Sequence, residues 1–123
     1  MKQNIKDGGE RLVYDGMAMR EPTTGKGAYH LMSPFLADRL AKWFELGAAK
    51  YAERNWEKGV PFSRLADSAE RHFTKWKMGL EDEDHLIAAI WNLGAIVHFE
   101  ELGRTDLDDM PHYLRESADG QKG

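Results

Sequence analysis

The chain has 123 residues, with 17 basic and 21 acidic side chains and a formal net charge of -4. This length suits a single domain over residues 1–123, and the acidic excess argues against dedicated nucleic-acid binding, which needs a basic surplus. There is no cysteine, which excludes disulfides and thiolate chemistry, and no apolar run reaches the length of a membrane span. We therefore expect a soluble cytoplasmic protein without membrane contact.

The N-terminal part is predicted to be an arm rather than a part of the helical core. Residues 1–10 are polar, and we expect them to be flexible, as we do residues 114–123 at the other end. Glycines and a proline interrupt residues 11–32. This pattern predicts an extended, loop-rich arm with at most a short hairpin.

A first helix is predicted to begin at Ser33 and Pro34, because serine caps helix N-termini and proline suits the first turn. We expect this helix to end near Tyr51. Its predicted buried side consists of Phe35, Leu36, Leu40, Trp43, Phe44 and Ala48. Glu45 falls among these apolar residues, where a carboxylate needs a partner. A basic side chain of a neighbouring helix and a functional ligand both remain open as that partner.

The connector that follows alternates cations with aromatic and amide side chains. Its residues of interest are Lys50, Tyr51, Arg54, Asn55, Trp56 and Lys58. A nucleotide site requires this combination, because an aromatic face stacks on a base while a cation neutralises phosphate. The alternative is that Trp56 closes the end of a helical bundle while the cations face water.

A second helix is predicted to be capped by Ser63 or a close neighbour and to end at Gly79. Leu65, Ala69, Phe73 and Trp76 form its predicted core stripe, and His72 lies on the same side. A single histidine on an apolar face is more often a satisfied core residue than a ligand. The adjacent Arg71 makes a functional role for His72 more plausible.

The stretch from Glu81 to Leu102 opens with four carboxylates and then runs apolar until Gly103. Its length, the lack of proline and the terminal glycine favour a helix, and apolar residues nearly all round predict a buried one. His85 and Asn92 stand seven residues apart and share one face, with Asp84 near its edge. Because buried polar groups need partners, this face is the best candidate for a functional site.

The four consecutive carboxylates, residues 81–84, have a structural and a functional interpretation. A helix N-terminus favours negative charge, but two carboxylates would suffice and four repel one another. A hard divalent cation relieves that repulsion, and Mg²⁺ or Mn²⁺ suits oxygen ligands in a chain without cysteine. With no evident covalent nucleophile, a metal beside phosphate-binding cations predicts hydrolysis of a phosphoanhydride by water.

Six segments follow one another in a recognisable order. They are GER at 9–11, DGMAMRE at 15–21, GKGAYHLMSP at 25–34, RLAKWFELGAAKYAERNWEKGVPFSR at 39–64, DSAERHF at 67–73 and EDHLIAAIWN at 83–92. Together they resemble the dATP/dGTP diphosphohydrolase N-terminal family, which is found mainly in bacteriophages and lies close to the MazG-like all-α nucleotide pyrophosphohydrolases. The resemblance spans residues 8–112.

The resemblance implies an all-α, MazG-like bundle of three main helices with a loop-rich N-terminal arm. Three helices are too few for a four-helix bundle, so a homodimer or homotetramer would complete it. The implied reaction is Mg²⁺-dependent hydrolysis of a purine deoxynucleoside triphosphate, dATP or dGTP, to the monophosphate and pyrophosphate. A phage origin would place the protein in the cytoplasm of the host cell.

By position, these residues match the family's connector, its RH pair and its EDH…N helix. We expect substrate binding by Lys50, Tyr51, Arg54, Asn55, Trp56, Lys58 and Arg71. We expect catalytic roles for His72, His85 and Asn92. His85 would orient or deprotonate water, and Asn92 would position it.

The metal ligands do not transfer directly, because MazG enzymes carry ExxE and ExxD motifs and this chain has no clean copy of either. We expect Glu45, Glu83 and Asp84 to bind the metal, with His85 as a further candidate ligand. Two alternatives remain: a nucleotide-binding module without turnover, and a helical phage structural or interaction protein whose acidic run only starts a helix.

Overall fold

The computed structural model describes residues 12–13 and 16–116. Its contacts divide the chain into two compact units, Met1–Pro34 and Phe35–Gly123, which we describe separately. In the first unit, strand β1 (Leu12–Val13) pairs antiparallel with β2 (Met19–Arg20), and a 3-10 turn, η1, covers Tyr29–Leu31. This confirms the predicted arm with a short hairpin. Residues 1–10 and most of 114–123, predicted to be flexible, lie outside the described residues.

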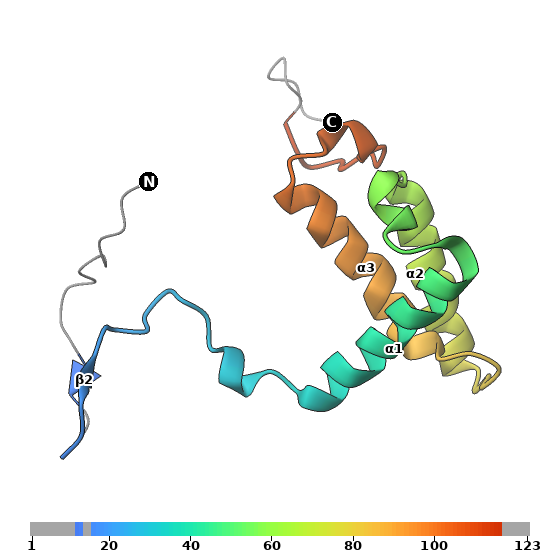
Figure 1. The fold of residues 1–123 in the computed structure, drawn as a ribbon. Coiled ribbons are helices and arrows are strands. Elements are labelled where there is room, and N and C mark those ends of the chain that lie inside the picture. Colours follow the sequence, from blue (N-terminus) through green and yellow to red (C-terminus); the bar gives the residue numbers. More distant parts are fainter. Residues whose placement is uncertain (1–11, 14–15, 117–123) are drawn as a thin grey trace. The chain divides into compact units, whose positions relative to one another are not determined.

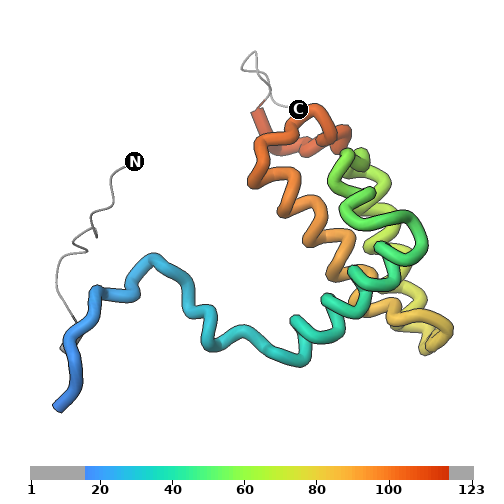
Figure 2. Tube along the Cα trace, viewed as in Figure 1, coloured from blue at the N-terminus to red at the C-terminus, as the bar shows by residue number. Residues whose placement is uncertain are grey.

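The second unit is helical, which confirms the predicted all-α fold of three main helices (Figure 1). Its elements are α1 (Pro34–Tyr51), η2 (Asn55–Lys58), α2 (Phe62–Lys77), α3 (His85–Glu101) and η3 (Thr105–Leu107). Helices α2 and α3 lie side by side along most of their length, as the tube in Figure 2 shows.

The core of this unit lies between α2 and α3, at the end where η3 packs. Its fully buried members are Phe62, Leu65, Ala95 and Phe99, and Trp56, Val60, Trp91, Ile96 and Leu107 pack against them. Phe99 is completely buried and contacts the rings of both Phe62 and Trp56. Burial of aromatic side chains of this size is the main stabilising contribution in a domain this small.

At the start of α2 the cap is Pro61, a close neighbour of Ser63 as predicted, although it makes no side-chain capping hydrogen bond. The helix begins at Phe62, so Ser63 is not its cap but its second residue. The Ser63 backbone N–H donates to Asp109 Oδ1 at 2.8 Å, and the Ser63 hydroxyl donates to Asp109 Oδ2 at 2.6 Å. These hydrogen bonds hold the pKa of the Asp109 carboxyl below its ordinary value. A residue 46 positions away therefore supplies the acceptor that an N-terminal helix turn needs.

The start of α3 shows how the acidic run is used. Asp84 is the N-cap, and its side chain accepts from the Ile87 N–H at 3.3 Å. The other three carboxylates precede the helix, in the turn that joins α2 to α3. Their positions are therefore set by the turn and not by the helical period.

Helix α1 contradicts the predicted buried face, since none of its residues, all of them described, is fully buried. Phe35 is 80% exposed, and Leu36 and Phe44 are exposed as well. The prediction that α3 is buried all round is also wrong, because Leu93 and Val97 are more than half exposed. An apolar helix face in the sequence predicts that another surface covers it. It does not say whether that surface belongs to the same chain.

Candidate active site

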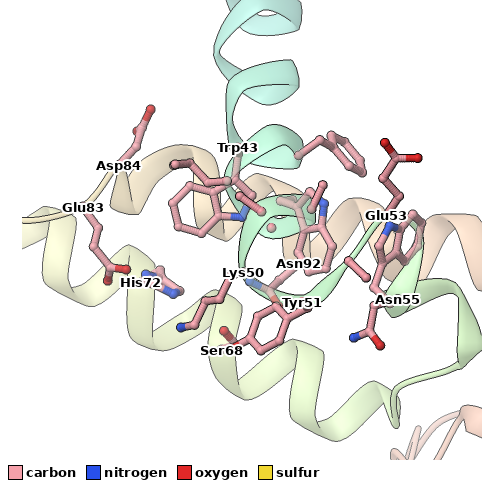
Figure 3. Close-up of a pocket in the computed structure, with 18 of the residues that line it drawn as sticks. Trp43, Lys50, Tyr51, Glu53, Asn55, Ser68, His72, Glu83, Asp84 and Asn92 are labelled. Carbon is pink, nitrogen blue, oxygen red and sulfur yellow. The ribbon is translucent and has the colours of Figure 1, made fainter.

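A cavity of about 1270 Å³ opens between the end of α1, the loop after it, α2 and the acidic turn (Figure 3). It is lined by residues 43, 44 and 46–57 from α1 and the loop, by Ser68, Arg71, His72 and Lys75 from α2, by residues 82–84 from the turn, and by Trp91 and Asn92 from α3. The cationic and aromatic connector and the acidic turn thus face a common space.

Most of the predicted site residues border this cavity. Those that do are Lys50, Tyr51, Arg54, Asn55, Trp56, Arg71, His72, Glu83, Asp84 and Asn92. Glu45, Lys58 and His85 are not among the lining residues. Lys58 is the exposed last residue of η2, and Glu45 is an exposed residue of α1. The expectation that Glu45 lies in apolar surroundings is wrong, because the face of α1 on which it lies is not covered within the described chain.

Local backbone conformation brings the connector around the cavity. Ala52 and Arg54 have φ values of 101° and 58°, in the left-handed region that L residues rarely adopt, and they reverse the chain between α1 and η2. The Arg54 guanidinium forms an ion pair with Glu57 at 3.1 Å, and the Lys50 ammonium lies 5.1 Å from the centre of the Tyr51 ring. The turn therefore places Arg54 after the chain has left α1, while Lys50 is still part of the helix.

Helix α2 adds two further cations to the cavity. Arg71 forms an ion pair with Asp67 one turn earlier, at 2.8 Å. Lys75, one turn later, also lines the cavity and was not predicted. Its spacing of four residues from Arg71 places both on one helix face, and this is the sequence signal that identifies it.

Trp56 serves the core as well as the cavity. It is half-buried, and its ring centre lies 4.7 Å from that of His98, 5.5 Å from that of Trp91 and 5.7 Å from that of Phe99. The predicted alternative, in which Trp56 closes the bundle, describes this packing. Tyr51 is 61% exposed and offers the more open aromatic ring of the connector.

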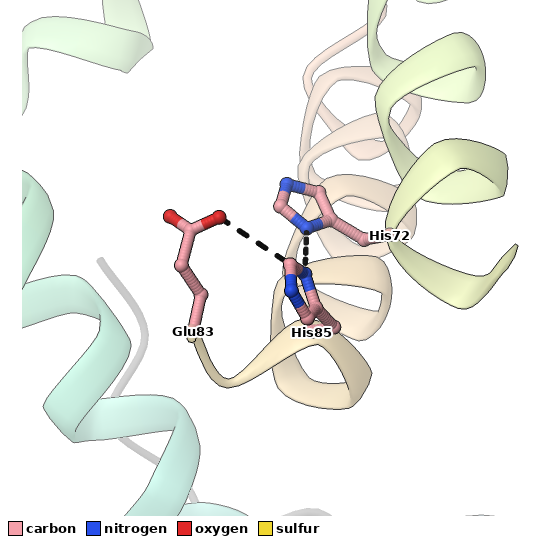
Figure 4. Close-up of side chains that lie close together, drawn as sticks. All are labelled: His72, Glu83 and His85. Atoms are coloured by element: carbon pink, nitrogen blue, oxygen red, sulfur yellow. Dashed lines mark hydrogen bonds and ion pairs between the residues drawn. The ribbon is translucent and has the colours of Figure 1, made fainter. Parts of the chain in front are cut away.

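Two histidines meet at the edge of the cavity, one from α2 and one from the start of α3 (Figure 4). The Nδ1 atoms of His72 and His85 are 2.9 Å apart. Burial lowers the pKa of His72 from its ordinary value, which favours the neutral ring. Nothing in the sequence indicates this contact, because it depends on how α2 and α3 pack.

His85 is only 2% exposed, and its other ring nitrogen is held by the acidic turn. The His85 Nε2–H donates to Asp82 Oδ1 at 2.7 Å, and this hydrogen bond lowers the pKa of Asp82. The carboxylate is therefore ionised and accepts, so the proton resides on Nε2. In the tautomer that carries its proton on Nε2, the lone pair on His85 Nδ1 accepts a hydrogen bond from the His72 Nδ1–H.

Within the described part of the chain, one group of side chains has the spacing needed to hold a divalent metal ion. It consists of His72, Glu83 and His85, whose ligand atoms all lie within 4.8 Å of one another. Glu83 was predicted as a ligand and His85 as a candidate ligand, but Asp84 and Glu45 do not belong to this group. Two imidazole nitrogens and a carboxylate form a donor set suited to divalent metals.

Asp84 borders the cavity but is already engaged by two partners. Its carboxylate accepts from the Arg39 side chain of α1, with Arg39 Nε 3.0 Å from Oδ2, and also caps α3. The hydrogen bond from Arg39 is the main reason that the pKa of Asp84 is lowered. Arg39 was not predicted as a partner, and the metal-ligand role of Asp84 stays a prediction.

Asn92 is a buried residue of α3. It is 6% exposed and lines the cavity, and its Nδ2 donates to the Ala88 carbonyl oxygen at 2.8 Å. This bond to the preceding helical turn orients the carboxamide, which is what a residue that positions a small ligand requires.

Fold and cavity together define an all-α protein that combines cationic side chains with a group able to hold a divalent metal. No helix among the described residues is long and apolar enough to cross a membrane. The family model described as dATP/dGTP diphosphohydrolase, N-terminal, matches residues 17–110. The chain therefore belongs to this family, which confirms the resemblance found in the sequence. The comparisons with curated proteins and with solved structures gave no match.

Proposed function

We propose that this protein is a metal-dependent nucleotide pyrophosphohydrolase that converts dATP or dGTP to the monophosphate and pyrophosphate. The observation that supports the proposal is the shared cavity: in a chain of this family, cationic side chains and two members of the group that can hold a metal, His72 and Glu83, border the same space. Each group alone has a structural explanation, whereas their combination is what phosphoanhydride hydrolysis requires.

In this proposal, the triphosphate is bound by the cations that border the cavity. Lys50, Arg71 and Lys75 line it from two different helices, so they can contact different phosphate groups. Tyr51 provides an exposed ring on which a purine can stack. The volume of about 1270 Å³ exceeds that of typical small-ligand pockets and leaves room for a nucleoside triphosphate.

The hydrolytic end of the site is the group around His72. His72, Glu83 and His85 would hold a divalent ion, which would supply charge stabilisation at the phosphorus centre. Asp82 holds the ring of His85 in one orientation, and Asn92, fixed by the Ala88 carbonyl oxygen, positions the attacking water. The sequence favoured Mg²⁺, with Mn²⁺ as the alternative.

We also propose that two or more copies of the chain associate. Helices α1 and α3 expose Phe35, Leu36, Ile90, Leu93 and Val97, and a small groove of about 210 Å³ between them is lined mainly by apolar side chains. A symmetric partner that covers this surface would supply the burial that α1 lacks. Sedimentation analysis would test this: a strictly monomeric chain at micromolar concentration contradicts the proposal.

The direct test is to incubate the folded protein with each common nucleoside triphosphate and a divalent ion and to measure released pyrophosphate. We expect release from dATP or dGTP and none after chelation of the metal. A flat result for all nucleotides contradicts the enzymatic function. If nucleotides then still raise the melting temperature, the binding module without turnover is the correct alternative. If neither nucleotide nor metal changes stability, the structural alternative is correct.

A further inference from the structure

The donor atoms of His72, Glu83 and His85 indicate which class of divalent metal ion this group would bind. The three side chains come from α2, from the acidic turn and from the first residue of α3, and Figure 4 shows them facing one another. The Oε2 atom of Glu83 is 4.0 Å from His85 Nδ1, and the two Nδ1 atoms are 2.9 Å apart. Half of the Glu83 side chain is exposed, so it can adjust towards an ion.

We propose that this group binds a six-coordinate first-row transition-metal ion, of the kind of Mn²⁺, Fe²⁺ or Co²⁺, in preference to Mg²⁺. Mg²⁺ selects oxygen ligands and retains its waters, whereas two of the three donors here are imidazole nitrogens. Two histidines and one carboxylate form a set that transition metals use, with positions left open for other ligands. The role of the ion in hydrolysis rests on the proposed function. The class of metal is what is added here.

The spacing of the two histidine nitrogens favours six-coordinate over tetrahedral geometry. Ligands about 2.1 Å from a metal are about 3.0 Å apart when they subtend a right angle and about 3.4 Å apart in a tetrahedron. The 2.9 Å separation is set by the hydrogen bond between the two rings, and it is nearer to the right-angle value than to the tetrahedral one. A tetrahedral ion would therefore require the larger displacement of the rings.

The orientation of His85 is that of a metal ligand. Histidines that bind metals usually donate their second ring N–H to a carboxylate, which fixes the tautomer and turns the other nitrogen towards the ion. In this structure Nε2–H donates to Asp82, and Nδ1 faces His72. Asp82 is accordingly a positioning residue, and Glu83, its neighbour in the chain, is the ligand.

The place of the group relative to the cavity supports a role in substrate binding. His72 and Glu83 both line the cavity that Lys50 and Arg71 also border. Three protein ligands occupy half of the positions of a six-coordinate ion. The remaining positions are available to water and to phosphate oxygens, which suits a metal that must contact a nucleotide.

The test is to titrate the full chain with Co²⁺ in the absence of nucleotide and to record its visible absorption. We expect one equivalent to bind with the weak bands of six-coordinate cobalt, and Mn²⁺ to compete, as followed by loss of the free Mn²⁺ signal in electron paramagnetic resonance. Mg²⁺ should displace either ion only in large excess.

Matched variants locate the site. His72→Gln should abolish the cobalt spectrum, while His112→Gln should leave it intact, because His112 is also paired with an aspartate but lies outside the group. Asp82→Asn should weaken metal binding by about 10- to 100-fold, and Asp108→Asn, which removes the partner of His112, should not. Because His85 is buried and its replacement can prevent folding, His72→Gln with an unchanged helical circular dichroism signal is the decisive variant.

Three results would overturn the inference: intense bands of tetrahedral cobalt, an unchanged spectrum in His72→Gln, or displacement by equimolar Mg²⁺. The contact of the two histidines would then be a hydrogen bond without a metal. Failure of the proposed function is recognised separately. If His72→Gln still hydrolyses nucleotides with Mg²⁺, the hydrolase remains and this site falls. If Co²⁺ binds as expected but no nucleotide is hydrolysed, the metal site is supported and the proposed hydrolase function is contradicted.

Discussion

Helices α2 and α3 contain all of the fully buried residues in the described part of the chain, whereas α1 contains none. Helix α1 is attached through a few side chains: the ring of Trp43 contacts His72, the ring of Phe44 contacts Trp91, and Arg39 is bound to Asp84. Both regions nevertheless border one cavity. The proposed metal ligands belong to the well-packed pair and the turn within it, and Lys50 and Tyr51 belong to the helix with little burial.

We propose that this difference in burial divides the site into a more rigid half, which contains the two histidines, and a more adaptable half. Ligand-binding segments are commonly drawn from the less stable parts of a protein, because they must move when a ligand enters. Groups that hold a metal need fixed geometry, which the packing of α2 against α3 provides. Substitutions in the two regions test this division, and their expected effects differ in size.

The largest effect is expected from truncation of the core. Phe99→Ala should lower the free energy of unfolding by about 3–5 kcal/mol, because Phe99 is completely buried between Phe62 and Trp56. Phe35→Ala on α1 should change it by less than about 0.5 kcal/mol at low protein concentration, because Phe35 is 80% exposed. Urea denaturation measures both values, and similar losses for the two variants would contradict the contrast between the regions.

The next largest effect is expected at Lys50, in the part of α1 proposed to bind substrate. Lys50→Met should raise the KM for dATP or dGTP by about 10- to 100-fold, because it removes a charged contact to phosphate from the cavity. Lys58→Met is the control, since Lys58 is exposed and does not line the cavity. Steady-state kinetics of pyrophosphate release gives both values. An equal rise for Lys58→Met would show that the connector changes its conformation when substrate binds.

A smaller effect is expected from the ion pair that fastens α1 to the start of α3. Arg39→Met should cost only about 0.2–1 kcal/mol, because the Arg39 side chain is 52% exposed and solvent screens the pair. Amide hydrogen exchange should accelerate in α1 and remain unchanged in α2. Lys42→Met is the matched control, because Lys42 pairs with Asp38 inside α1 itself. Faster exchange in α2 as well would mean that the two regions open together.

The smallest effect is a pH dependence at the start of α2. The pKa of Asp109 is lowered in the folded state by its hydrogen bonds from Ser63. Its stabilising contribution is therefore complete above the pKa of the unfolded chain and is lost as the pH falls through the lower, folded value. Wild type and Asp109→Ala should differ in melting temperature at neutral pH and converge in strong acid. A difference that persists there would mean that the contact does not depend on the charge.

The predictable part of this structure was the part encoded locally. The start of α1 at Pro34, the end of α3 before Gly103 and the loop-rich arm follow from capping residues, helix formers and glycines that act within one turn of the chain. The connector and the acidic turn, which their residue types alone singled out for phosphate and metal chemistry, both border the cavity.

The sequence by itself thus determined the class of fold, the family and the segments that border the cavity. Only the tertiary structure decided which side chains meet: His72 with His85, Arg39 with Asp84 and Ser63 with Asp109. These contacts join residues 13, 45 and 46 positions apart. Helix periodicity fixes the face on which a side chain lies but not the neighbour that the face receives, because that neighbour depends on how separate helices pack.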